Sequence, residues 1–193
     1  MTTQTLHPVF SASTALSRLA MATAALGLSA CASMGGAPTF NQASLPDAVK
    51  VPAGHAVKME TAAAGDITYE CRAKAAMAGQ FEWVFVGPDA GMKSRSGQVV
   101  GIYYGPPATW ESKDSSKVTG TQVAVAPASA GSIPLQLVKA NPATGAGSMQ
   151  GTTYIQRVNT QGGVAPSAPC AAGNLGQKQL VRYQADYIFW RAV

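Results

Sequence analysis

The clearest chemical signal in this sequence surrounds its first cysteine. Cys31 follows Leu-Ser-Ala at positions 28–30, an order typical of the bacterial lipobox, in which the cysteine thiol is acylated and becomes the first mature residue. Small residues before the cysteine allow the backbone to enter a signal peptidase. We therefore predict that Cys31 is a lipid attachment site. The alternative is cleavage by an ordinary signal peptidase after Ala30 or Ala32.

The two remaining cysteines, Cys71 and Cys170, form an even pair once Cys31 is acylated. In an oxidising compartment such a pair forms a disulfide. A bridge that closes so long a loop stabilises a fold by about 4–5 kcal/mol on the chain-entropy model. We predict a Cys71–Cys170 disulfide; two buried free thiols are the alternative.

Catalytic and metal-binding patterns have little support in this sequence. His55 is the only histidine after residue 30, and no Gly-x-Ser-x-Gly elbow accompanies it. One histidine and two paired cysteines cannot form a His/Cys zinc site. We expect His55 to be a structural residue at the start of a strand. The sequence therefore predicts no catalytic residue, no metal ligand and no cofactor.

A group of aromatic and acidic residues is the first part of a candidate ligand surface. Tyr103, Tyr104 and Trp110 flank a Gly-Pro-Pro turn, and Glu111 and Asp114 follow. Aromatic side chains beside a rigid turn can stack on sugar rings or hold a proline-rich or other peptide. The alternative is that these aromatic side chains only cover the core, as they usually do in small β domains.

Four polar residues nearer the C-terminus complete the candidate surface: Arg157, Asn159, Arg182 and Asp186. They can supply charged contacts to a ligand. On neighbouring strands the arginines and Asp186 can equally form an ion pair whose role is structural.

The elements that must position these residues are strands. After residue 50 apolar residues recur with a period of two, and Gly- and Pro-rich turns separate the alternating segments. The predicted strands are residues 56–60, 66–71, 81–86, 98–104, 118–126, 132–139, 152–158 and 180–190. We predict an all-β fold, an antiparallel β-sandwich or partly open barrel.

The first 50 residues differ from the rest of the chain. Arg18 is the only charged side chain before Asp47, and it precedes a short apolar segment at 19–30. That segment is about half as long as the roughly 20 residues that a transmembrane helix needs. We predict a signal peptide at 1–30, a flexible tether at 31–50 and one β-rich domain at 51–193.

Several motifs in the domain occur in a familiar order. The most specific is Gln-Arg-x-x-Thr-x-Gly-Gly-x-Ala-Pro at 156–166, and others are Val-Pro-Ala-Gly-His at 51–55 and Tyr-Glu-Cys at 69–71. From about residue 45 to the C-terminus the chain resembles the DUF3455 family, a bacterial and fungal family of unknown function. The resemblance implies no established activity. The chain departs from the family pattern at Tyr103, where a histidine is common, at Pro107-Ala108, which are inserted, and at Ser115-Ser116, where Asp-Gly is usual.

These observations predict an exported envelope lipoprotein with a non-enzymatic binding or structural domain. Its expected partners are the membrane, through the lipid anchor, and an envelope glycan, peptide or protein. The residues that follow Cys31, Ala32 and Ser33, include no aspartate, which favours the outer membrane, with the domain facing the periplasm or the cell surface. The basic residues are scattered despite a net charge of +5, which argues against nucleic-acid binding. The alternative is a small-molecule or glycan-binding domain, or a hydrolase with a carboxylate pair from Glu111, Asp114 and Asp186.

Overall fold

The computed structural model describes residues 40–193, and nearly all of its regular structure consists of β-strands. Eight antiparallel strands follow one another in chain order and close into a barrel. Two 3-10 turns, η1 (Asp47–Val49) and η2 (Ala172–Asn174), accompany them. The strands are β1 (His55–Ala73), β2 (Phe81–Ser94), β3 (Val99–Tyr104), β4 (Thr109–Ser112), β5 (Lys117–Ala126), β6 (Leu135–Ala140), β7 (Tyr154–Gly162) and β8 (Lys178–Ala192). The predicted antiparallel all-β class is confirmed, and the sheet closes on itself.

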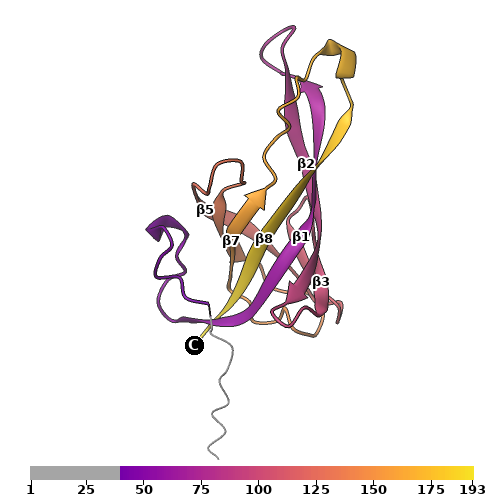
Figure 1. Ribbon diagram of the computed structural model, residues 1–193. Helices are drawn as coiled ribbons and strands as arrows, with labels where there is room; N and C mark the ends of the chain where they lie inside the picture. The colour runs from indigo at the N-terminus through magenta and orange to yellow at the C-terminus, as the bar shows by residue number, and fades with distance from the viewer. Residues whose placement is uncertain (1–39) are drawn as a thin grey trace, which may run out of the picture. The chain divides into compact units, whose positions relative to one another are not determined.

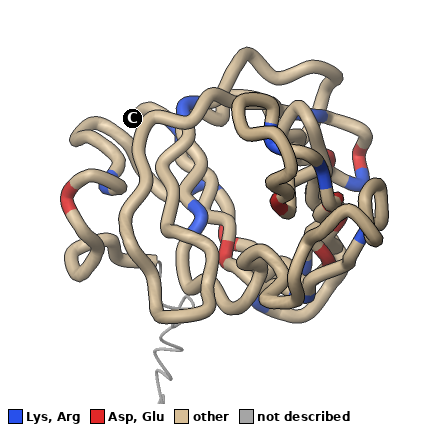
Figure 2. The backbone as a smooth tube through the Cα atoms, turned by 90° about the horizontal axis from the view of Figure 1, so that it is seen from above, with Lys and Arg blue, Asp and Glu red and all other residues tan. Residues whose placement is uncertain are grey.

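The barrel closes where the first strand pairs with the last. β1 pairs along most of its length with both β2 and β8, and from above the backbone runs round a ring (Figure 2). The strands predicted at 56–60 and 66–71 are one continuous strand, because the small residues between them contain no turn. At Gly65 a side chain would have no room, since a Cβ atom there would lie 2.0 Å from the Asp89 carbonyl oxygen on β2.

Aromatic side chains fill the barrel interior. Trp110 stacks on Tyr103 with ring centroids 4.8 Å apart and lies edge-on to Tyr187 and Phe189 at 5.6 and 6.5 Å. Met149, from the loop after β6, is buried among them. The buried interior residues are Ala63, Ile67, Tyr69, Ala90, Met92, Tyr103, Trp110, Val118, Ile133, Val138, Met149, Ile155, Tyr183, Ala185, Tyr187 and Phe189. Trp110 belongs to the core, as the alternative reading of the aromatic residues had it.

The segment before β1 packs against the outside of the barrel. Val49 and Val51 are buried in a second cluster with Trp190, and Phe40 meets the edge of the Trp190 ring at 6.4 Å. The Gln156 side-chain amide donates to the Val49 carbonyl at 2.6 Å. Residues 40–50, the described part of the predicted tether, are therefore part of the folded domain, because their apolar side chains cover the outward face of β7 and β8.

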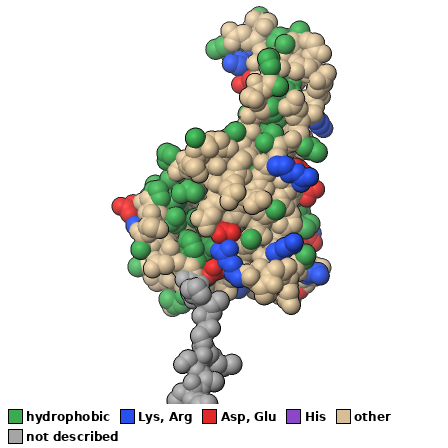
Figure 3. Space-filling model, in the orientation of Figure 1, with side chains coloured by type: hydrophobic (Ala, Val, Ile, Leu, Met, Phe, Trp, Pro, Cys, Tyr) green, Lys and Arg blue, Asp and Glu red, His purple; other side chains and the backbone are tan. Residues whose placement is uncertain are grey.

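An arm projects from one end of the barrel (Figures 1 and 3). It consists of residues 68–87 and 164–180, which extend past the last pairings of β2 with β3 and of β7 with β8. The predicted disulfide between Cys71 and Cys170 is present in the arm, with Cα atoms 5.4 Å apart. It holds the loop between β7 and β8 against β1. No helix between residues 40 and 193 is long and apolar enough to cross a membrane.

Candidate ligand-binding site at the barrel mouth

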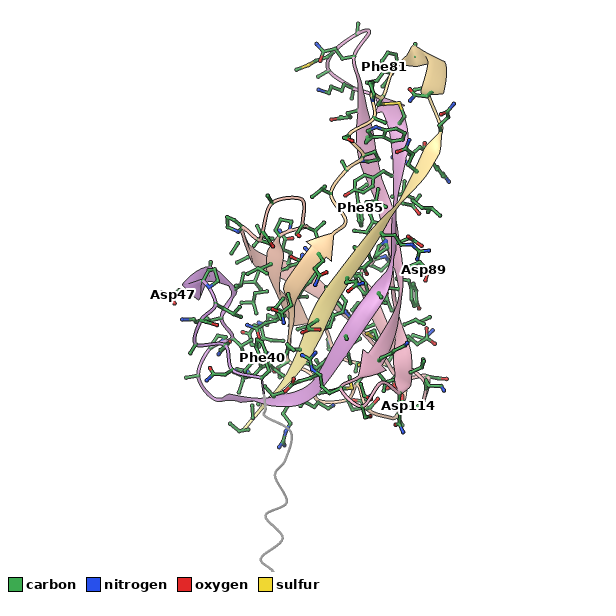
Figure 4. All side chains as sticks on the ribbon, viewed as in Figure 1. Phe40, Asp47, Phe81, Phe85, Asp89 and Asp114 are labelled. Carbon is green, nitrogen blue, oxygen red and sulfur yellow. A yellow bond between two sulfur atoms is a disulfide. The ribbon has the colours of Figure 1, made fainter. Side chains whose placement is uncertain are left out.

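The barrel has a hollow at the end that faces the arm. Its volume is about 380 Å³, and its wall includes Phe85, Pro88, Tyr103, Pro106, Gln122 and Arg157. Phe85 lies at the base of the arm, where β2 enters the barrel (Figure 4). The opposite end is closed, since Met149 is buried there with its backbone N–H on the Ser116 hydroxyl. Barrel mouths are common places for small-molecule sites.

Glycines bring the backbone close to the rim of this hollow. A Cβ atom at Gly87 would lie 2.1 Å from the Gly105 carbonyl oxygen, so the turn after β3 rests directly on β2. Gly120 on β5 lines the hollow, and a Cβ atom there would collide with Val138. The glycine at this inward position leaves space that a side chain would fill.

Arg157 supplies the charge of the hollow. It lies on β7 between the buried residues Gln156 and Val158. Its Nε and Nη2 groups both donate to the Pro134 carbonyl, at 3.2 and 3.0 Å. It forms no ion pair with a carboxylate of residues 40–193. The guanidinium therefore carries an uncompensated positive charge at the wall of an otherwise uncharged hollow.

Buried tyrosines lie in the interior next to Arg157. The Tyr103 and Tyr187 rings are 4.8 Å apart, and the hydroxyls of Tyr183 and Tyr187 are buried without a hydrogen-bond partner in the described part of the chain. Burial raises the pKa of Tyr103, Tyr183 and Tyr187, and the charge of Arg157 lowers each pKa by a smaller amount. We call these three residues and Arg157 the tyrosine–arginine cluster.

The family model described as "Protein of unknown function (DUF3455)" matches residues 52–191 of this chain. That span contains all eight strands except Ala192, the last residue of β8. The chain belongs to the DUF3455 family. No curated protein and no solved structure matches it. The segment at 40–50, which covers Trp190, lies before the matched region of the DUF3455 domain.

The DUF3455 barrel separates the first part of the predicted ligand surface into two faces. Tyr103 and Trp110 point inward, with 6% and 1% of their surfaces exposed. Tyr104 and Glu111 form an outer group, in which the Tyr104 hydroxyl donates to Glu111 at 3.0 Å and Lys117 forms an ion pair with the same carboxylate at 3.1 Å. Among these residues only Tyr103 reaches the hollow.

Asp114 lies in the turn between β4 and β5, at the end of the barrel away from the arm (Figure 4). Its carboxylate accepts hydrogen bonds from the Ser116 hydroxyl, the Ser116 backbone N–H and the Ser148 backbone N–H. These bonds hold the pKa of Asp114 well below its usual range. Asp114 therefore joins the turn between β4 and β5 to the loop that contains Ser148. It lies at the opposite end of the barrel from the hollow.

The second part of the predicted surface is also divided. Asn159 donates to Asp186 at 2.8 Å, and Arg95, which the sequence did not single out, forms an ion pair with Asp186 at 3.0 Å. Arg182 pairs instead with Asp66 at 3.2 Å. The basic positions are spread around the ring (Figure 2). Only Arg157 of this part lines the hollow.

The three acidic residues considered for a hydrolase are held in separate groups. Glu111 contacts Lys117, Asp114 contacts serines, and Asp186 contacts Arg95 and Asn159. The hydrogen bonds from Lys117 and Tyr104 lower the pKa of Glu111, the opposite of what a general acid needs. No group of three potential metal ligands occurs among residues 40–193. The structure therefore separates these three carboxylates, and Asp186 shares the Arg95 guanidinium with Glu60 instead.

His55 is the first residue of β1. Its Nδ1 atom lies 3.1 Å from the Pro52 carbonyl, and its ring meets the edge of the Tyr154 ring at 5.0 Å. This position agrees with a structural histidine at a strand entrance.

Sequence reasoning missed several residues of the hollow. Gln122 and Gln136 line it, and the Gln136 amide donates to Gln122 at 2.6 Å. Phe85 was assigned to a strand but to no site. The period-two pattern places Gln122 on the same face as Val118 and Gly120, so an inward polar residue was visible. That Gln122 lines a hollow depends on the closure of the barrel, which no local pattern specifies.

The tyrosine–arginine cluster predicts loss of stability in alkali. A tyrosine whose folded-state pKa is raised stabilises the fold fully below the unfolded pKa of about 10, and this contribution is lost as the pH rises through the folded-state pKa. We expect the cluster to ionise above about pH 10 together with unfolding. Tyrosinate absorbance and near-ultraviolet circular dichroism measure the two events. Ionisation of all tyrosines below that pH in a still folded protein would contradict the prediction, and Tyr187→Phe should weaken the alkaline loss.

Proposed function

We propose that this DUF3455 protein is an exported envelope lipoprotein that binds a small molecule in the mouth of its barrel, without catalysing a reaction on it. The observation that carries the binding role is the hollow of about 380 Å³, which combines apolar walls with one unpaired guanidinium. Small-molecule sites typically join an apolar lining to a few polar groups that orient the ligand. The hollow has this composition.

The arrangement of the acidic residues supports a binding role over the hydrolase alternative. None of Glu111, Asp114 and Asp186 lines the hollow. Each is held by hydrogen bonds or ion pairs on the outside of the barrel. A general acid near neutral pH needs a carboxyl group whose pKa is raised by its surroundings. The surroundings of Glu111 and Asp114 lower it.

Export and the anchor rest on the sequence, because the signal peptide at 1–30 and Cys31 lie outside the described residues. The Cys71–Cys170 disulfide supports an oxidising compartment, where such bridges form and persist. Folded residues begin by Phe40, which leaves the segment 32–39 between the proposed acylated cysteine and the domain. We propose that the domain stands close to the membrane that holds Cys31.

The binding role is tested by blocking the hollow. In Gln122→Trp the new ring would occupy the barrel mouth, whereas Val123→Trp places the same ring on the neighbouring, 55% exposed position of the same strand. Both proteins are purified from their own envelope and weighed intact under native conditions. We expect an additional small-molecule mass in the wild type and in Val123→Trp, and at least a tenfold lower occupancy in Gln122→Trp. Equal occupancy in all three proteins contradicts binding at the mouth.

The anchor is tested in the same preparation. We expect the wild-type chain to begin at Cys31, to carry the mass of acyl chains and to sediment with membranes. Cys31→Ser should abolish the acyl mass and the membrane association. A soluble wild-type chain that begins after Ala30 or Ala32 would contradict the lipoprotein assignment.

A further inference from the structure

The charge of the hollow indicates the class of its ligand. Arg157 is the one charged side chain in the wall, and it has no acidic partner between residues 40 and 193. Among the described residues, its Nε and Nη2 groups are the ones that donate to protein, and both donate to the Pro134 carbonyl oxygen. A guanidinium has five N–H donors in a planar fork that fits a carboxylate. A ligand with a negative group would supply the partner that the protein does not.

Two buried tyrosine hydroxyls lie in the interior cluster next to the hollow. Tyr183 and Tyr187 are 2% and 0% exposed, and neither hydroxyl has a partner in the described residues. Their rings belong to the interior cluster that contains the lining residue Tyr103. Buried hydroxyls are normally hydrogen-bonded. Neither residue lines the hollow, so the class of the ligand rests on the guanidinium of Arg157.

Most of the other side chains in the wall are apolar, and the amides of Gln122 and Gln136 are among its remaining polar groups. Phe85, Pro88, Pro106 and Val138 surround the opening, and about half of the Phe85 surface is exposed. The volume of about 380 Å³ is near the lower end of ordinary ligand sites. A single positive charge balances a monoanion, whereas a phosphate dianion would call for a second cation, which the wall does not contain.

We infer that the mouth binds a small monocarboxylate, with its carboxylate on Arg157 and its apolar part against Phe85, Pro88 and Pro106. This inference rests on the proposed binding function and adds the chemical class of the ligand. The amide pair of Gln122 and Gln136 lies at the wall beside the apolar part.

The test uses isothermal titration of the mature, acylated protein in detergent with benzoate, hexanoate and 4-hydroxyphenylacetate. The neutral analogue benzyl alcohol and inorganic phosphate serve as comparison ligands. We expect at least one carboxylate to bind at least tenfold more tightly than benzyl alcohol or phosphate. Arg157→Gln should weaken this binding by roughly 10- to 100-fold, the usual effect of removing a hydrogen-bonded charge. Arg157→Lys keeps the charge but not the planar set of donors, so its affinity for the carboxylate should lie between those of the wild type and Arg157→Gln.

Arg182→Gln is the matched control, because Arg182 lies on the outside with 87% of its side chain exposed. It should leave carboxylate binding unchanged, and circular dichroism confirms that each variant is folded. Failure of all three carboxylates to bind, or equal binding by wild type and Arg157→Gln, overturns the inference. If benzyl alcohol binds equally well and Gln122→Trp blocks it, the anion class is wrong and the binding role stands. If Gln122→Trp changes nothing in either assay, the proposed function itself fails.

Discussion

Trp110→Ala should lower the free energy of unfolding by about 3–5 kcal/mol, the range for removal of a buried large aromatic side chain. Trp110 is 1% exposed and contacts the rings of Tyr103, Tyr187 and Phe189. The surrounding strands are closed into a barrel and cannot collapse into the cavity. Urea unfolding followed by far-ultraviolet circular dichroism gives the change in free energy.

Ile102→Ala is the matched control for this prediction. Ile102 lies on β3 beside Tyr103 but faces outward with 44% of its surface exposed, so we expect a change of about 0.5 kcal/mol or less. A loss below about 1 kcal/mol for Trp110→Ala would mean that the interior is loosely packed. The comparison also separates the two interpretations of the aromatic residues, because a ligand-contacting tryptophan would affect binding more than folding.

Removing the disulfide is the second change with a large expected effect. Cys71 and Cys170 are 99 residues apart in sequence, and loss of a bridge across a long loop typically costs about 2–5 kcal/mol. We expect a loss in this range for Cys71→Ala combined with Cys170→Ala, measured by urea unfolding under non-reducing conditions. The double variant removes both thiols of the bridge, so neither can pair with another chain.

The place of the loss is as informative as its size. The bridge joins two segments of the arm, so hydrogen exchange should increase first at residues 164–177 and last in the barrel interior. A global destabilisation with uniform exchange would contradict this order. A change below about 1 kcal/mol would show that the arm unfolds separately from the barrel.

Local patterns were sufficient to predict most strands, but not which strands pair to close the barrel. The alternation in β2 follows from burial of one face of the strand, whereas the end of β8 is buried on both faces. β4 is not among the predicted strands, because its four residues beside the Gly-Pro-Pro turn are too few to show an alternation. The closure of β1 on β8 depends on residues more than a hundred positions apart, such as Thr61 and Tyr187, whose hydrogen bond spans 126 residues. No local spacing specifies such a contact.

The candidate site was predicted only in part for the same reason. Tyr103 and Arg157 were identified as polar or aromatic residues of interest, and both line the hollow. Their companions Tyr104 and Arg182 face outward, because neighbouring positions on a strand point to opposite sides. The segment at 40–50 looked like a linker from its composition. Its few apolar residues, Phe40, Leu45 and Val49, are the ones that cover Trp190 and its neighbours.

The order of the strands also determines when this domain can fold. β8 pairs with β7 on one side and with β1 on the other. One edge of the first strand can therefore pair only after the last strand is available. A chain that emerges N-terminus first, from a ribosome or through a membrane channel, can pair β1 with β2 early but leaves the other edge of β1 unpaired until β8 has emerged. Folds dominated by such distant pairings form slowly. The topology therefore delays closure of the barrel until β8 has emerged, and the chain stays open until then.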